Sequence, residues 1–262
     1  MLLAAVIFNI YGFYEASEIE ITRLKISNPD MAQNAAPIRI VQVSDLHYGL
    51  TMLNSRHQNI LKQVQALNPD MIISTGDFLD RGSENSLEHM LAWQTLQPRL
   101  GKYAVTGNHE AIANLPRSLK LLKTAGFKVL RGELEDFSSF RLIGLDDPRT
   151  GESDKLNFII DELKDRTGIS ILLHHRPGWP KKFNGLFDLV LSGHTHGGQI
   201  FPFAALVYFT HGNLSGLYPT EWGGASYVNR GTGTWGPPVR ILSPPEITLF
   251  VMQHGETKQI GY

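Results

Sequence analysis

The feature that most constrains the fold is a repeated unit in which a short, mostly apolar run ends in a polar cluster and is followed by a helical pattern. The first half of the chain has three such units: Ile38 to Val43 with Ser44-Asp45-Leu46-His47, Met71 to Ser74 with Gly76-Asp77, and Lys102 to Val105 with Gly107-Asn108-His109-Glu110. Strands that alternate with helices form sheets with parallel strands, whose carboxyl ends meet at one edge. The pattern therefore predicts an α/β domain with its polar clusters gathered at one sheet edge.

The remaining elements extend this pattern through the chain. Helices are expected near Asn54 to Leu67 with Asn54 as N-cap, Ser83 to Leu96, Pro116 to Ala125 and Asp154 to Asp165. Strands are expected at Phe127 to Leu130, Phe140 to Leu145, Ile169 to Leu173, Leu186 to Leu191, about Ala225 to Asn229 and about Ile247 to Met252. Glu18 to Ile26 alternates polar and apolar residues, as an edge strand does. No repeat of fixed period occurs, which excludes a solenoid.

Charge and cysteine content limit the chemistry that the domain can carry out. The chain has 24 Lys and Arg against 25 Asp and Glu, a net charge of -1, and so lacks the basic field that favours nucleic-acid binding. We expect no nucleic-acid partner, and no pattern predicts a protein partner. The chain has no cysteine, which excludes disulfides and thiolate ligands. A metal ion would have to be held by His, Asn and carboxylate side chains.

The polar residues at the expected strand ends have the side chains of metal ligands. They are Asp45, His47, Asp77, Asn108, His109, the pair His174 and His175, His194 and His196. Taken singly, each cluster is also explained by a turn or a solvated histidine. His194 and His196 are the stronger signal, because residues two apart on an extended chain project to one side. Two divalent ions need roughly three or four ligands each and a shared carboxylate, so the full set fits two ions better than one.

In their order along the chain, these clusters resemble the five-block signature of the calcineurin-like metallophosphoesterases. The blocks are Asp45-Leu46-His47, Gly76 to Arg81, Gly107 to Glu110, His175 and Gly193 to His196. The sequences Gly197-Gly198-Gln199, Tyr227 to Gly231 and Pro245-Glu246-Ile247 further resemble a bacterial membrane-associated branch with the motif GHTHGGQ. The resemblance covers about Ile38 to the C-terminus. It implies an α/β fold that is a four-layer α/β/β/α sandwich, with two central mixed sheets and the metals at one edge.

The resemblance also implies how the ligands are divided between two metals. Asp45, His47, Asp77 and His196 would hold the first ion, and Asp77, Asn108, His175 and His194 the second. Asp77 would bridge the two, which suits a carboxylate with its two oxygens better than an imidazole. The mixed nitrogen and oxygen donors suit Mn²⁺, Fe or Zn²⁺, and the sequence does not distinguish among them.

Both His174 and His175 follow the same expected strand, and His175 is the predicted ligand. In the family, one residue and then His-x-Pro follow the apolar run, which His175 matches through Arg176-Pro177. Neighbouring residues of a strand point to opposite faces, so His174 would be packed or would support a ligand. The reverse assignment is the alternative.

His109 is the predicted catalytic residue. Two cations would neutralise the oxygens of a phosphoester and lower the pKa of a bound water to about 7, and attack would build negative charge on the leaving oxygen. His109 lies beside the ligand Asn108 and is free to donate a proton or a hydrogen bond there. Asp80 and Arg81 are expected to orient a ligand histidine and the loop, respectively. The histidines outside the blocks are expected at the surface: His57, His89, His211 and His254.

Two apolar segments lie outside this pattern. Residues 1–17 begin with Met1 to Tyr14, almost wholly apolar but shorter than the roughly 20 residues that span a bilayer. We interpret this segment as a membrane anchor or the end of one, with packing on the domain surface as the alternative. Residues 18–262 would form the phosphoesterase domain. Gln199 to Tyr218 includes a long apolar run, either packed in the core or forming a lip that faces a membrane or lipid.

Together these features predict a dinuclear metal-dependent phosphoesterase that cleaves phosphodiester or pyrophosphate bonds. The apolar segments favour membrane association and an amphiphilic, lipid-linked substrate. One example is UDP-diacylglucosamine, the substrate of a related branch of the family that the chain resembles. A soluble nucleotide phosphodiesterase and a metal-binding scaffold without turnover are the alternatives. No basic residue precedes Arg23, which favours a catalytic domain outside the cytoplasm, with a cytoplasmic domain as the alternative.

Overall fold

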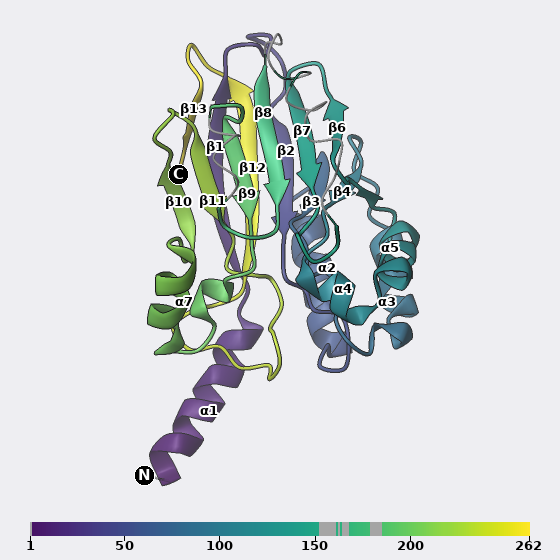
Figure 1. Cartoon of the computed structure of the whole chain (residues 1–262), viewed down its shortest axis with the longest axis vertical. Coiled ribbons are helices and arrows are strands. Elements are labelled where there is room, and N and C mark those ends of the chain that lie inside the picture. Colours follow the sequence, from purple (N-terminus) through teal and green to yellow (C-terminus); the bar gives the residue numbers. More distant parts are fainter. Residues whose placement is uncertain (1, 152–160, 162, 164–167, 179–184) are drawn as a thin grey trace.

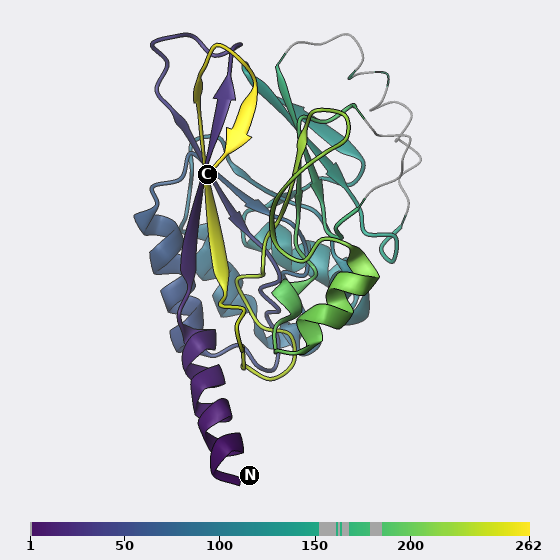
Figure 2. The same cartoon turned by 90° about the vertical axis from the view of Figure 1, so that its left-hand side faces the viewer.

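Two mixed β-sheets lie face to face in the computed structural model, which describes residues 2–151, 161, 163, 168–178 and 185–262 (Figures 1 and 2). The larger sheet, in the order β13-β1-β12-β2-β3-β4-β5, contains β1 (Glu20–Asn28), β2 (Ile38–Val43), β3 (Met71–Ser74), β4 (Lys102–Ala104), β5 (Lys128–Val129), β12 (Glu246–His254) and β13 (Gln259–Gly261). The smaller sheet, in the order β10-β11-β9-β8-β7-β6, contains β6 (Glu133–Asp136), β7 (Phe140–Leu145), β8 (Ile169–His174), β9 (Leu189–Ser192), β10 (Gly216–Pro219) and β11 (Ala225–Val228). The expected pair of mixed sheets is confirmed.

Helices cover the outer face of the larger sheet and surround the lower end of the molecule in Figure 1. The α-helices are α1 (Leu2–Ser17), α2 (Asn54–Ala66), α3 (Leu87–Gln94), α4 (Asn108–Ala113), α5 (Leu115–Thr124) and α7 (Phe203–His211). Short 3₁₀ turns form at Ser83–Asn85 and His196–Gly198. The helix expected near Asp154 to Asp165 lies outside the described residues, apart from residues 161 and 163.

Strand β2 shows how the sequence builds these layers. Ile38 and Ile40 face the smaller sheet and join the core between the two sheets. Val41 and Val43 point the other way, into the core that α2, α3 and α5 cover. An apolar run without alternation is typical of a strand buried on both faces, because every side chain then enters a core. Such burial fixes the strand register, and with it the position of the polar residues that follow the strand.

The ends of the parallel strands define the edge at which those polar residues gather. Strands β2, β3 and β4 are parallel neighbours in one sheet, and β7, β8 and β9 are parallel neighbours in the other. Figure 1 shows both sets ending toward the lower end of the molecule, where α7 also lies. Clusters far apart in sequence are therefore brought to one end of the sandwich.

Three local expectations were wrong. Strand β1 is not an edge strand, because β13 pairs with it antiparallel and β12 pairs with it on the other side. Asn54 is the first residue of α2 rather than its N-cap; Leu53 holds that position, and the Asn54 side chain hydrogen-bonds His89 instead. The helix expected over Ser83 to Leu96 is divided into a 3₁₀ turn and α3, since Ser86 departs from helical geometry.

The two apolar segments are both exposed at the lower end of the molecule. No residue of α7 is buried, so the interpretation of this run as a core element was wrong. Helix α1 projects from the domain, and only its last turns pack against it: the Gly12 carbonyl accepts from the Arg240 amide and the Glu15 carboxylate from the Leu242 amide (Figure 2). Among the described helices, none combines the length and apolar character needed to cross a membrane.

Candidate metal centre

Sharp turns after the strands aim the predicted ligands at one another. Nine described residues other than glycine have positive φ, and five of them are predicted ligands. These five are Asp45, His47, Asp77, His194 and His196, with φ of 52°, 50°, 48°, 72° and 51°. Left-handed backbone disfavours side chains with a Cβ, and residues held in it concentrate at functional sites. The backbone strain at these five positions therefore indicates that they belong to a functional site.

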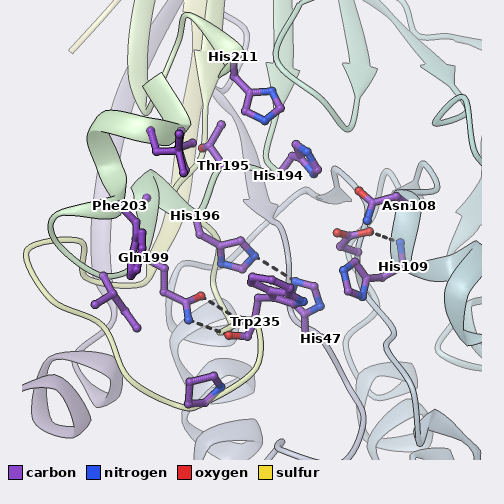
Figure 3. Close-up of a pocket in the computed structure, with 16 residues that line it drawn as sticks. His47, Asn108, His109, His194, Thr195, His196, Gln199, Phe203, His211 and Trp235 are labelled. Atoms are coloured by element: carbon purple, nitrogen blue, oxygen red, sulfur yellow. Dashed lines mark hydrogen bonds between the residues drawn. The ribbon is translucent and has the colours of Figure 1, made fainter. Parts of the chain in front are cut away.

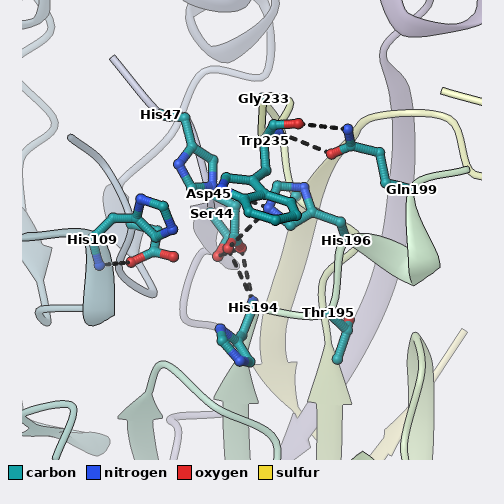
Figure 4. A network of polar contacts seen from close by, with 12 residues as sticks. Ser44, Asp45, His47, His109, His194, Thr195, His196, Gln199, Gly233 and Trp235 are labelled. Carbon is teal, nitrogen blue, oxygen red and sulfur yellow. Dashed lines mark hydrogen bonds and ion pairs between the residues drawn. The ribbon is translucent and has the colours of Figure 1, made fainter. Parts of the chain in front are cut away.

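A first group of ligands joins the loop after β2 to the turn after β9. The Nε2 atoms of His47 and His196 are 3.1 Å apart, and Oδ1 of Asp45 is 3.6 Å from the same His196 nitrogen (Figure 4). All three side chains are buried. Two imidazole nitrogens that face each other at this distance need a proton or a cation between their lone pairs. The group has the donor atoms and spacing of a metal site.

A second group lies beside the first and joins β3, β8 and β9. Nε2 of His175 is 3.1 Å from Oδ2 of Asp77 and 3.1 Å from Nδ1 of His194. The other ring nitrogen of His175 is 2.8 Å from the Thr75 carbonyl, which can only accept, so this nitrogen carries the proton. That hydrogen bond leaves Nε2 as the free donor atom, which is the state a metal ligand requires.

Asn108 supplies the clearest indication of a missing partner. It is the first residue of α4 and is buried, yet within the described part of the chain its Oδ1 atom has no hydrogen-bond partner. A buried carbonyl oxygen without a partner costs roughly 1–3 kcal/mol, so it is expected to meet a ligand. Asn108 and Asp77 line the same cavity, and the residues present therefore fit a second cation beside the first.

The two groups share a cavity of about 500 Å³ (Figure 3). One wall carries the predicted ligands His47, Asp77, Asn108, His194 and His196 together with His109. The opposite wall is apolar and comes largely from α7 and the segment before it, through Ile200, Phe203, Leu206 and Val207. A phosphoester bound at the polar wall would thus have room for an apolar substituent.

Burial and contact with neighbouring groups shift the pKa values of the predicted ligands, upward for some and downward for others. Burial alone would lower the pKa of His175, but the adjacent Asp77 raises it to about 10. Burial, assisted by the neighbouring His175, lowers the pKa of His194 to about 3. Burial also raises the pKa of Asp45. Buried carboxylates are stable only with compensating positive charge, and a metal ion competes with the proton of His175 for that role.

Asp80 connects a predicted ligand to the predicted acid. Its Oδ2 is 3.2 Å from Nδ1 of His47, and its Oδ1 is 2.9 Å from Nδ1 of His109. The expected role of Asp80 in orienting a histidine thus extends to two rings. Burial alone would lower the pKa of His109, but the hydrogen bond to Asp80 and the charges of Asp77, Asp80 and Glu110 together raise it. With Nδ1 held in this way, Nε2 of His109 is left to act on a bound molecule, and the ring lines the cavity.

Glu110 and Arg240 hold the loops that carry the ligands. The buried Glu110 carboxylate accepts hydrogen bonds from the amides of Asp77, Leu79 and Gly107. The buried Arg240 guanidinium donates to the carbonyls of His196, Arg230, Gly231, Gly233 and Ser243. Sequence reasoning missed Arg240, because only the folded chain brings it beneath His196.

The structure separates the paired histidines. His175 joins the second ligand group, whereas Nδ1 of His174 is 2.8 Å from the Arg176 carbonyl and His174 belongs to neither group. The expectation of a surface position was wrong for His57. His57 is buried, with Nδ1 2.7 Å from the Tyr48 hydroxyl. His211 lines the cavity, and its ring centroid is 5.0 Å from that of His194.

Comparisons with known proteins show the family and the fold. The family model described as Calcineurin-like phosphoesterase matches residues 38–198. A protein of Aquifex aeolicus named uncharacterized metallophosphoesterase is 34% identical over 95% of this chain and 97% of its own length. A Danio rerio protein named transmembrane protein with metallophosphoesterase domain is 31% identical over 96% of this chain and 62% of its own length. The solved structure of a dimetal phosphatase from Danio rerio has the same fold, with a TM-score of 0.53 at 12% identity over 75% of this chain and 88% of that one.

Proposed function

Because this chain belongs to the calcineurin-like phosphoesterase family and is a metal-dependent phosphoester hydrolase, we propose that two divalent ions at the site described above serve its reaction. Asp45, His47, Asp77 and His196 would hold one ion, and Asp77, Asn108, His175 and His194 the other. The observation that carries this proposal is the pair of facing nitrogens, at 3.1 Å in each group, beside an Asn108 oxygen that has no partner among the described residues. Mn²⁺, Fe and Zn²⁺ all suit these donors.

The chain's own residues would bind the substrate and handle the proton. When bound, the ions neutralise phosphoryl oxygens and supply an activated water. His109 would protonate the leaving oxygen through Nε2, while Asp80 holds its Nδ1 at 2.9 Å. The raised pKa of His109 supports this role, because the protonated form persists nearer to neutral pH. The complete set of ligands favours an enzyme over a metal-binding scaffold.

For the substrate, we propose a phosphodiester or pyrophosphate with a lipid-linked group, of which UDP-diacylglucosamine is an example. The apolar wall of the cavity supports this class. Ile200, Phe203, Leu206 and Val207 line the space beside the ligands, and α7, which carries the last three of them, has no buried residue. Burying one such side chain against an acyl chain contributes roughly 1.5–3 kcal/mol. A soluble nucleotide, the substrate in the alternative reading, has no acyl chain to bury against this wall.

Together with a lipid-linked substrate, we propose that the protein associates with a membrane through α1 and α7. The side chains of α1 from Val6 to Tyr11 are exposed and mostly apolar, with Ile10 65% exposed, and Phe209 in α7 is 85% exposed. A helix that is apolar on all sides calls for surroundings that are apolar on all sides, which a bilayer supplies better than a flat protein surface. The absence of a basic residue before Arg23 supports a catalytic domain outside the cytoplasm, with the cytoplasm as the alternative.

The experiment that tests this function combines a substrate panel with metal reconstitution. Apo-protein loaded with Mn²⁺, Fe²⁺ or Zn²⁺ would be assayed on p-nitrophenyl esters, nucleotide diesters and lipid pyrophosphates, with and without mixed micelles. We expect metal-dependent hydrolysis, fastest on the lipid pyrophosphate in micelles. His175→Ala should lose most of this activity and bind less metal, while the matched control His174→Ala should keep its metal. Activity on soluble nucleotides alone would contradict the lipid proposal and support the alternative.

A further inference from the structure

A second cavity, of about 530 Å³, adjoins the metal-site cavity. The two have three lining residues in common: Asn108, His109 and Trp235. The far walls of the second cavity come from the loop after β2, through Leu50 and Thr51, and from Arg81 and Arg149. Where the first cavity is apolar beyond the ligands, the second is basic. His109, the residue that would protonate the leaving oxygen, therefore faces both.

Two guanidinium groups give the second cavity its charge. Arg81 and Arg149 are both exposed, and within the described part of the chain neither side chain has a hydrogen-bond or ion-pair partner. Asp80 is the acidic residue in this wall, and its two oxygens are already bound to His47, His109 and the Arg81 amide. Within the described residues, neither guanidinium is paired with a carboxylate, and the two positive charges exceed the one negative charge of Asp80 in this wall, an arrangement suited to an anion.

Hydrogen bonds and ion pairs hold the loop that carries Arg149. The buried Asp147 accepts a hydrogen bond from the Arg149 amide at 2.9 Å and is ion-paired with Arg176 at 2.5 Å. The Thr150 hydroxyl donates to the Asp147 carbonyl at 2.8 Å. Asp146, the other acid of the loop, is paired with Arg131. Asp146 and Asp147 therefore pair with other arginines, and the hydrogen bond from the Arg149 amide holds the backbone at this residue.

Trp235 forms the partition between the two cavities. Its side chain is 58% exposed, but its main chain is clamped by Gln199, which accepts from the Trp235 amide at 2.9 Å and donates to its carbonyl at 2.7 Å. The indole lies 6.4 Å from the His109 ring between centroids (Figure 3). An exposed aromatic ring on a fixed main chain, in the same cavity as two arginines, suits a ligand that combines an anionic group with a planar or sugar ring.

We propose that this second cavity is a leaving-group subsite that binds a further phosphate, attached to the leaving oxygen, through Arg149 and Arg81. The inference rests on the proposed function, because it takes His109 as the group that faces the leaving oxygen. Guanidinium groups bind phosphate oxygens through paired N–H donors and remain charged at any working pH. The substrates it favours are pyrophosphate esters, whose leaving group is a phosphate monoester, over simple diesters with a neutral alcohol as leaving group.

The test compares two esters that differ by this phosphate: the methyl esters of uridine 5′-diphosphate and of uridine 5′-monophosphate. Attack on the methyl-bearing phosphorus releases uridine 5′-monophosphate from the first and uridine from the second. In Arg149→Gln, kcat/KM should fall about tenfold more for the diphosphate ester than for the monophosphate ester, the loss typical of one charge-assisted hydrogen bond near solvent. Arg149→Lys should recover part of it, and Arg23→Gln, an exposed arginine outside both cavities, should change neither.

Calorimetric binding of uridine 5′-monophosphate to the metal-loaded protein tests the subsite without turnover. Arg149→Gln should weaken this binding while the bound metal, measured by mass spectrometry, stays the same. Equal losses for the two esters, or unchanged binding of the monophosphate, would overturn the subsite. If the wild type cleaves neither ester but Arg149→Gln still weakens monophosphate binding, the subsite stands and the proposed function fails for these substrates.

Discussion

Asp80 contacts both a proposed metal ligand and the proposed acid. Its carboxylate holds His47, a proposed ligand, with one oxygen and His109, the proposed acid, with the other. Both contacts are made to Nδ1, so both rings present Nε2 to the cavity. The same anchoring thus leaves Nε2 free in both histidines, whose rings stand perpendicular with their centroids 4.6 Å apart. The position and direction of each ring then decide whether it meets a metal or a leaving group.

The role of His109 leads to a prediction about leaving groups. His109→Ala should keep both metals but lose about 10²–10⁴ in rate on esters with an alkoxide leaving group, which needs a proton. The loss should be distinctly smaller on p-nitrophenyl esters, because nitrophenolate departs unprotonated. The measurement is kcat/KM for both ester types, with metal content determined on the same sample. Equal losses would mean that His109 stabilises the phosphoryl oxygens, and loss of metal would remove it from the catalytic group.

His57 leads to a prediction about stability and pH. Burial and the neighbouring His89 lower its pKa to about 4, while Tyr48, which accepts a hydrogen bond from Trp93, can donate to the neutral ring. In the unfolded chain the pKa is about 6.5, so the unfolded state takes up the proton first as pH falls. Stability from His57 is therefore complete above pH about 6.5 and is lost as pH falls toward the folded pKa of about 4.

The matched variant is His57→Gln, which retains a hydrogen-bond acceptor for Tyr48 but does not titrate. The melting temperature of the metal-free protein, measured from pH 7 to pH 5, should fall more for the wild type than for the variant. Other buried histidines titrate in both proteins, so only the difference reports on His57. Identical slopes would contradict the assignment of a low pKa to this residue.

The structure brings the predicted ligand residues together for a physical reason. Asp45, His47, His194 and His196 directly follow strands, and a strand end is a local feature that apolar patterning reveals. Trp235, His211 and Arg240 come from segments without such a pattern, and only the tertiary path brings them to the cavity or beneath His196. The sequence indicated chemistry where residue type and local structure coincide, and failed where long-range packing alone decides.

At the scale of elements, the limits of sequence reasoning appear in the apolar segments and the sheet edge. The alternation in β1 is typical of an edge strand, but the C-terminal β13 covers that edge, a pairing that depends on residues more than 200 positions away. The apolar run in α7 is compatible with a core helix or an exposed one. Composition alone does not tell the two apart, because burial depends on which surfaces lie opposite.

The exposure of α1 and α7 predicts binding to lipid. Flotation with phosphatidylcholine vesicles should recover the wild-type protein, and the double variants Ile10→Ser/Phe13→Ser and Leu206→Ser/Phe209→Ser should each bind at least about tenfold more weakly, as expected when two large apolar side chains lose burial. The control is Leu91→Ser, an exposed apolar residue on α3. Absence of wild-type binding, or equal binding by all variants, would contradict the membrane proposal.

At the scale of the whole molecule, the site depends on the two sheets meeting at one end. Asp45, His47 and Asp77 come from loops of the larger sheet, while His175, His194 and His196 come from the smaller one. Each ligand group therefore contains residues of both sheets, and neither sheet alone holds a complete set. The core between the sheets fixes the distance between the two halves, so metal binding should stabilise the sandwich as a whole.

The central claim is that this sandwich binds two ions that share Asp77. The most direct measurement is anomalous diffraction from crystals of the Mn²⁺-loaded protein. We expect two peaks about 3.5–4 Å apart, one against Nε2 of His47 and His196 and one against Nε2 of His175 and Nδ1 of His194, with the Asp77 carboxylate between them. A single peak, or a carboxylate of Asp77 that contacts only one ion, would contradict the account.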